Sequence, residues 1–349
     1  MLFSIIIPAY NAENTLRETL DSAINQTFDD YEIVLVNDGS TDKTEKICNE
    51  LYGSNRHFNY IKQNNKGVYE ARRTGAKQSK GDYLIFVDAD DRLRPDSLSI
   101  LASHITSHDP DIICFRYTRN EDYTNDPLLS SPLTPAFYSG DTLKRVRECL
   151  AQGRLTSIWG KAIKKKCINR SLASKQSKRI DFAEDLLQII PIIEDAESLL
   201  QIDEILYFYN AENSRSATHN YKEKQLRDLT YVTATLIQNV AHWGNTIKNE
   251  SLRMRTSQYL YLLQINELTS PADQKKENFL AISKELFDIE DEALPPRGGY
   301  RPDSQLLFLA AKYSNYSLSR FVIQTSEIAK KAICTIIKYA PLKERPVSI

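Results

Sequence analysis

Three carboxylates, Asp88, Asp90 and Asp91, come directly after an apolar run at residues 83–87. A run of this length is typical of a buried strand, so the acids are expected at its carboxyl end. In open α/β sheets, ligands bind in the crevice beyond the carboxyl ends of the strands. Two carboxylates one residue apart can share a hard divalent cation, and that cation can hold a diphosphate. The stretch therefore predicts a metal and phosphate site.

Two earlier apolar runs end in further candidates. Pro8, Ala9 and Tyr10 follow the first run, where an aromatic ring beside open peptide groups can stack on a nucleobase. Asp38 and Gly39 follow the second, where an acid can accept hydrogen bonds from a base or a ribose hydroxyl. Each stretch also fits an ordinary strand-to-helix turn with a capping side chain, so both interpretations stay open at this point.

Arg72 and Arg73 lie early in a predicted helix, just before the acid-bearing run. An arginine at this place can reach a nucleotide or its phosphates, whereas a solvated pair on a helix face is the commoner arrangement. The chain has neither a Gly-x-Gly-x-x-Gly fingerprint nor a Walker loop, which lowers the weight of a dinucleotide-binding or P-loop enzyme.

Short apolar runs alternate with segments of helical period over the first third of the chain, which is typical of a parallel sheet with crossover helices. A strand-like run at 156–163, a helix at 181–195 and a strand at 199–209 continue this pattern. Beyond residue 214 the pattern becomes long and helical. We expect an α/β fold with a mostly parallel sheet, and the first five predicted strands lie at 3–8, 31–37, 57–62, 82–87 and 111–116.

The composition argues against several classes of protein. Lys plus Arg number 45 and Asp plus Glu number 46, so the net charge of −1 offers no general attraction for nucleic acid. The five cysteines have neither metal-ligand spacing nor a disulfide pattern, which favours a reducing cytoplasm. The N-terminus lacks the features of a signal peptide, and no stretch reaches the roughly 20 apolar residues of a spanning helix. Any membrane contact is therefore expected at the surface.

Four stretches, at residues 5–11, 34–42, 65–76 and 81–91, together resemble the glycosyltransferases of family two, which have the GT-A fold. The resemblance is dense over residues 1–116, thinner to 216 and absent beyond. It implies a catalytic domain at 1–216, with a nucleotide-binding half at 1–116 and an acceptor half at 117–216. A helical subdomain would then occupy residues 217–349.

The resemblance also implies an activity. Enzymes of this family move a hexose or N-acetylhexosamine from a UDP-sugar to a hydroxyl, with inversion and with Mn²⁺ or Mg²⁺. The expected acceptor is a growing, lipid-linked bacterial surface glycan such as a lipopolysaccharide, O-antigen or capsule. Asp90 would be the direct metal ligand, with Asp88 nearer the ribose. The other donor-binding positions implied at this end of the sheet are Pro8, Ala9, Tyr10, Asp38, Arg72 and Ala89.

The acceptor half offers a general base and three further contacts. Glu184 and Asp185 open a predicted helix, where the helix dipole favours ionised acids, and the resemblance assigns Asp185 as base with Glu184 as the second choice. Trp159 would lie beside the donor sugar and Lys161 would pair with phosphate, although a tryptophan filling the core is equally compatible. Arg215 lies in a loop expected to close over the diphosphate.

The last predicted helix, at 317–340, interleaves apolar side chains with Arg and Lys. This pattern fits an amphipathic helix on the cytoplasmic face of the inner membrane, and it equally fits packing on the protein core. Two other functions remain open: a phosphatase of the haloacid dehalogenase class with Asp88 as nucleophile, and a non-catalytic protein that binds sugar nucleotides. A carboxylate at Asp91 and a motif outside the first strand argue against the phosphatase.

Overall fold

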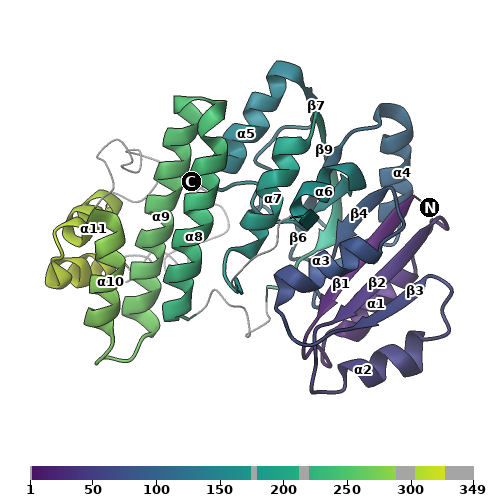
Figure 1. The fold of residues 1–349 in the computed structure, drawn as a ribbon, viewed down its shortest axis with the longest axis horizontal. Helices are drawn as coiled ribbons and strands as arrows, with labels where there is room; N and C mark the ends of the chain where they lie inside the picture. Colours follow the sequence, from purple (N-terminus) through teal and green to yellow (C-terminus); the bar gives the residue numbers. More distant parts are fainter. Residues whose placement is uncertain (1, 174–178, 212–219, 288–302, 327–349) are drawn as a thin grey trace, which may run out of the picture.

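The computed structural model describes residues 2–173, 179–211, 220–287 and 303–326. Within these residues, nine strands form one sheet at one end of an elongated molecule, and the last helices lie at the other end (Figure 1). Eight strands follow the order β3-β2-β1-β4-β8-β6-β9-β5, and β7 pairs with β9. The expected α/β fold is therefore confirmed.

Four neighbouring parallel strands form the first half of the sheet. They agree with the predicted strands to within a residue or two; β1, β2 and β4 are buried runs rich in apolar residues with turn residues after them, and β3 is partly buried. Alternate residues face opposite sides: Ile6 and Leu84 belong to one core, and Ile5 and Ile85 to the other. The strands are β1 (Phe3–Ala9), β2 (Tyr31–Asn37), β3 (Phe58–Lys62) and β4 (Tyr83–Phe86).

The second half of the sheet is mixed rather than parallel. β8 (Lys161–Lys164) lies between β4 and β6 (Ile112–Thr118) and runs antiparallel to both. β9 (Ser198–Phe208) pairs with β6 in parallel. β5 (Arg92–Leu93) and β7 (Ala136–Ser139) each pair antiparallel with β9. The sequence analysis did not predict β5 and β7, because both are short and their pairing depends on distant residues.

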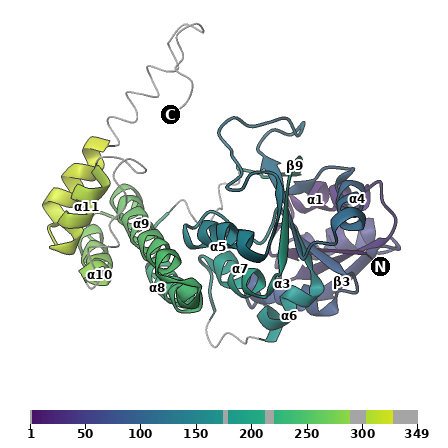
Figure 2. The same cartoon turned by 90° about the horizontal axis from the view of Figure 1, so that it is seen from above.

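Helices cover both faces of the sheet (Figure 2). One core joins the sheet to α1 (Leu16–Ile24) and α4 (Ser97–His108). The other joins it to four helices: α3 (Val68–Gln78), α5 (Leu143–Ala151), α6 (Lys165–Ala173) and α7 (Glu184–Asp195). The short α2 (Thr44–Ile47) follows β2, and a π-helical turn (Cys48–Tyr52) continues it.

The helical region is packed on the part of the molecule that contains the sheet. α8 (Glu223–Val240) and α9 (Asn245–Thr269) contribute Val232, Leu236 and Met254 to the core that holds α5 and α7. α10 (Lys275–Phe287), α11 (Asp303–Lys312) and a helix at 316–326 extend away from the sheet (Figure 1). The expected boundary at 216 lies outside the described residues, as does most of the predicted 317–340 helix. None of the described helices is long and apolar enough to span a bilayer.

Candidate active site

An open cleft of ≈ 990 Å³ lies at the carboxyl ends of β1, β2 and β4. The resemblance predicted nine of its lining residues, most of which follow a strand end. The described lining residues include five carboxylates and two arginines. The predicted residues are Pro8, Ala9, Tyr10, Asp38, Arg72, Asp88, Ala89, Asp90 and Glu184.

Asp38 fixes the floor of the cleft through the loop that follows β3. Its buried carboxylate accepts hydrogen bonds from Gln63 Nε2 at 2.7 Å, from Lys66 N at 2.9 Å and from Gly67 N at 2.8 Å. Gly67 has a φ of +89°, which favours glycine. Tyr10 projects from the same edge with 52% of its surface exposed, so its ring is available for stacking.

Arg72 joins the two groups of acids. Its guanidinium, 2% exposed, donates to Asp88 Oδ1 at 2.8 Å and to Asp185 Oδ1, and lies 3.5 Å from Glu184 Oε1. Burial raises the pKa of Asp88, and Arg72 opposes that rise. Asp185 Oδ2 also accepts a hydrogen bond from Ile158 N at 3.4 Å. A single buried cation therefore joins Asp88, one of the two predicted metal ligands, to the predicted base.

Asp91 ties the acid-bearing turn to the end of β9. It is 1% exposed and accepts hydrogen bonds from Tyr207 Oη at 2.6 Å and Asn210 N at 2.9 Å. Burial, with Asp88 and Asp90 nearby, raises its pKa to about 8. This carboxyl group therefore holds the turn in place, a role that the sequence left open.

Glu184 and Asp185 occupy the first turn of α7, as predicted. Ala183 precedes them in the left-handed region with φ of 58°, which turns the chain sharply into the helix. Burial and the adjacent Asp185 raise the pKa of Glu184 to about 8. Phe182 is 7% exposed and packs in the core formed by α9, α10 and α11.

The segment before α7 is held by α8, a contact that sequence reasoning missed. Asp181 N donates to Asp228 Oδ2 at 2.9 Å, and Lys224 Nζ donates to Asp181 Oδ2 at 2.9 Å. Arg179 lines the cleft and donates to Asp181 Oδ1 at 2.7 Å and Asn65 Oδ1 at 2.6 Å. The only signal was a cluster of charges spread over 50 residues, with no local pattern to connect them.

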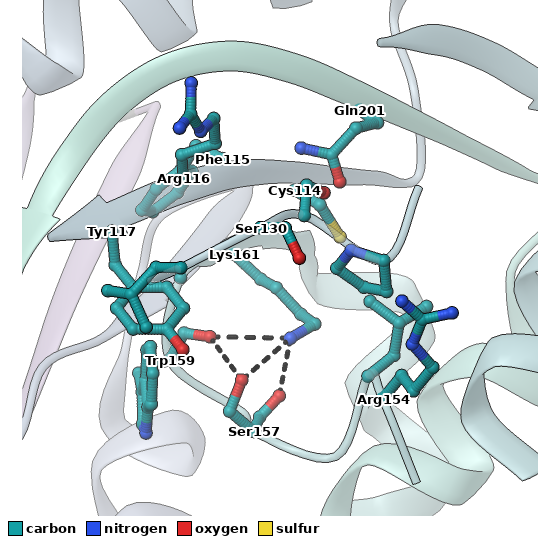
Figure 3. Close-up of a pocket in the computed structure, with 15 residues that line it drawn as sticks. Cys114, Phe115, Arg116, Tyr117, Ser130, Arg154, Ser157, Trp159, Lys161 and Gln201 are labelled. Atoms are coloured by element: carbon teal, nitrogen blue, oxygen red, sulfur yellow. Dashed lines mark hydrogen bonds between the residues drawn. The ribbon is translucent and has the colours of Figure 1, made fainter. Parts of the chain in front are cut away.

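Trp159 and Lys161 line a different pocket, shown in Figure 3. The indole of Trp159 stacks on Tyr207 and Tyr209 with centroid distances of 5.2 and 5.4 Å, and meets Tyr117 edge-on. The Lys161 ammonium donates to oxygens of its own loop. The structure thus does not bring these side chains to the cleft, because they pack with the loop and its neighbours. Arg215 lies outside the described residues.

The chemistry of the cleft suits a hard cation bound jointly with a ligand. In the described part of the chain, no three His, Cys, Asp or Glu side chains are arranged to hold a metal ion by themselves. Asp88 and Asp90 supply only oxygen ligands, which suit Mg²⁺ or Mn²⁺. A protein site of one or two carboxylates is normal where substrate phosphates supply other ligands. The residues present therefore fit such an ion in the presence of a diphosphate.

The N-terminal part of the chain carries the decisive similarity. Residues 4–160 match the family model described as glycosyl transferase family 2. Residues 4–160 therefore form a region of the glycosyltransferase family 2 type. The matched residues include the ends of β1 and β2 and the turn from Asp88 to Asp91. The match therefore favours a glycosyltransferase over the phosphatase alternative. Solved structures agree in fold: TarS of S. aureus in complex with UDP-GlcNAc superposes with a TM-score of 0.70 at 17% identity, covering 94% of this chain and 92% of that one.

The curated proteins similar to this chain include bacterial glycosyltransferases. EpsJ of Bacillus subtilis is 31% identical over 221 residues, 62% of this chain and 63% of that protein. GlyA of Streptococcus pneumoniae is 43% identical over 114 residues, 33% of this chain and 16% of that protein. The chondroitin synthase of Pasteurella multocida is 38% identical over 128 residues, 37% of this chain and 13% of that protein. The chain thus spans under two thirds of each relative.

Proposed function

We propose that the protein is an inverting glycosyltransferase that moves a hexose or N-acetylhexosamine from a UDP-sugar to a hydroxyl of a bacterial surface glycan. The observation that carries this is the position of Arg72, which joins Asp88 of the acid-bearing turn to the Asp185 carboxylate on α7. The match to family 2 supports the reaction class. The UDP-GlcNAc named with TarS supports a uridine donor, and the GDP-Man and Mn²⁺ named with a Pyrobaculum calidifontis mannosyltransferase support a metal.

In this proposal Tyr10 and Asp38 hold the uridine, and Asp90 with Asp88 holds Mn²⁺ or Mg²⁺. When bound, that ion would supply neutralisation of the charge on the departing diphosphate. Asp185 accepts the proton of the acceptor hydroxyl while the oxygen of that hydroxyl bonds to the anomeric carbon of the donor sugar. The bond from that carbon to the diphosphate breaks, and UDP leaves with the electron pair. Arg72 orients Asp185 through its hydrogen bond to the carboxylate.

The location and acceptor belong to the same proposal. We infer a lipid-linked saccharide acceptor met at the cytoplasmic face of the inner membrane, with no nucleic acid partner. Arg320 and the exposed Phe321 of the helix at 316–326 begin the basic amphipathic pattern that suggested this contact.

Release of UDP from a panel of UDP-sugars, with and without EDTA, tests the proposal. We expect one or a few donors to be turned over only with Mn²⁺ or Mg²⁺. Asp185→Asn should lower kcat by at least about 100-fold and leave UDP affinity within about twofold, because only proton transfer is lost. Asp195→Asn, at the far end of α7, is the matched control. UDP binding without turnover of any donor would instead favour a non-catalytic protein.

A further inference from the structure

A second pocket, of ≈ 70 Å³, is built from β6, the loops at 129–132 and 154–160, Lys161 of β8, and Gln201 of β9 (Figure 3). It shares no described lining residue with the cleft. It is far smaller than the cleft of ≈ 990 Å³ and has room for a small polar group.

Lys161 carries a buried positive charge into this pocket. The side chain is 3% exposed, and Nζ donates to Ser157 O at 2.6 Å, to Ser157 Oγ at 3.2 Å and to Trp159 O at 3.4 Å. All three acceptors are uncharged, two of them belong to Ser157, and the contact with Trp159 O is long for a hydrogen bond of an ammonium. Burial lowers the pKa of Lys161, while Cys114 and Asp185 act to raise it.

No carboxylate compensates that charge inside the pocket. The fifteen described lining residues include no Asp or Glu. Burial raises the pKa of the Cys114 thiol, which therefore stays uncharged at neutral pH. Arg116 also lines the pocket, but its guanidinium already pairs with Asp203 at 3.2 Å. Within the pocket the Lys161 ammonium therefore contacts only uncharged oxygens, and Asp185, which does not line the pocket, is a carboxylate that acts on it from outside.

Two further groups at the pocket suit an anion. Arg154 lies at the rim, and among the described residues no carboxylate pairs with its guanidinium. Ser130 directs its hydroxyl toward the same space as Lys161 (Figure 3). Arginine, lysine and hydroxyl donors together are the usual ligands of phosphate and carboxylate groups.

We propose that this pocket binds one small anionic group, a phosphate or a carboxylate, carried by the acceptor. The anion-binding part stands on the pocket alone, and its assignment to the acceptor rests on the proposed function. The pocket lies next to the predicted base. Ile158 N donates to Asp185 Oδ2 at 3.4 Å, and the residues on either side of Ile158 line the pocket. An anion held by Lys161 and Arg154 would place the acceptor on the Asp185 side of the cleft.

Phosphate binding in EDTA tests the pocket directly, because the five carboxylates of the cleft repel phosphate when no metal is present. We expect inorganic phosphate or methyl phosphate to raise the melting temperature of the wild type. Lys161→Met and Arg154→Met should each weaken phosphate binding by about 10-fold or more. Arg145→Met, which removes an exposed cation outside the pocket, is the control and should bind as the wild type does.

Arg154 lies at the surface, so its variant should fold even if Lys161→Met does not. Unchanged phosphate affinity in Arg154→Met and in any folded Lys161 variant would overturn the proposal, as would no binding to the wild type at millimolar phosphate. Acetate tested in parallel separates the two ligand sources: tighter phosphate binding indicates a phosphodiester acceptor, and tighter acetate binding indicates a uronate. UDP affinity, measured on the same samples with Mn²⁺, reports separately on the proposed function.

Discussion

The cleft and the small pocket lie close together and carry opposite charge. The cleft has five carboxylates against two arginines among its described lining residues, whereas the pocket has three cationic side chains and no acid. An acidic cleft repels a bare diphosphate, so a donor of that kind needs a metal ion with it. The pocket, whose charged lining side chains are all cationic, attracts an anion without a metal ion. The difference suggests that charge sorts the two substrates to the two sides of Asp185.

Removing the expected metal ligand tests the acidic side most severely. Asp90→Asn should lower kcat/KM for the UDP-sugar by about 1000-fold, because the charge on the leaving diphosphate is no longer neutralised. The melting temperature should stay near that of the wild type. Asp96→Asn, an exposed acid paired with Arg94, is the control in steady-state assays. Full activity of Asp90→Asn in EDTA would contradict the need for a metal ion in the cleft.

Arg72 is the internal cation that keeps the cleft carboxylates together. Arg72→Met should lower the free energy of unfolding by about 3–5 kcal/mol, because it leaves buried acids without their partner. Arg73→Met, one residue away and paired with Glu70, should cost clearly less. Urea unfolding followed by circular dichroism measures both. Equal losses of unfolding free energy in the two variants would contradict the stabilisation of the buried acids by Arg72.

The pH dependence of stability measures how strongly the cleft disfavours ionised acids. The pKa of Glu184 is 4.5 ordinarily and about 8 in the fold. Between these values only the folded state binds the proton, so the contribution of Glu184 to stability is present below pH 4.5 and is lost as pH rises toward 8. The stability of the wild type relative to Glu184→Gln should therefore fall across this window. A constant difference would contradict the assigned pKa.

The smallest effect is expected at α8, outside both sites. Asp228→Leu removes the buried carboxylate that accepts the part-buried Asp181 N–H and should cost about 1–3 kcal/mol of stability. It should also lower kcat while leaving donor KM unchanged, since Asp181 precedes Glu184 by three residues. Asp228→Asn keeps an acceptor oxygen and should restore most of both quantities. Loss of stability alone, with normal kcat, would make this contact purely structural.

Sequence reasoning succeeded where a function depends on a strand end. The acids after β4, the turn after β1 and Asp38 all follow apolar runs that are buried on both faces, so their positions were predictable. It failed where position depends on packing between distant segments. Lys161 lies in the small pocket because its loop folds back on itself, and Asp228 reaches Asp181 across 47 residues. Neither contact has a local pattern, and most of the cost of forming such contacts is in loop closure.

The insertion of β8 between β4 and β6 has a consequence for synthesis of the chain. β1 to β4 pair with one another and need only the first 86 residues, whereas β6 reaches β4 only through a strand that ends at Lys164. We therefore expect a chain emerging from the ribosome to fold in two stages, with the nucleotide-binding strands first. Protease resistance of ribosome-bound chains should appear near residue 120 for this half, and for β6 only after β8 has emerged.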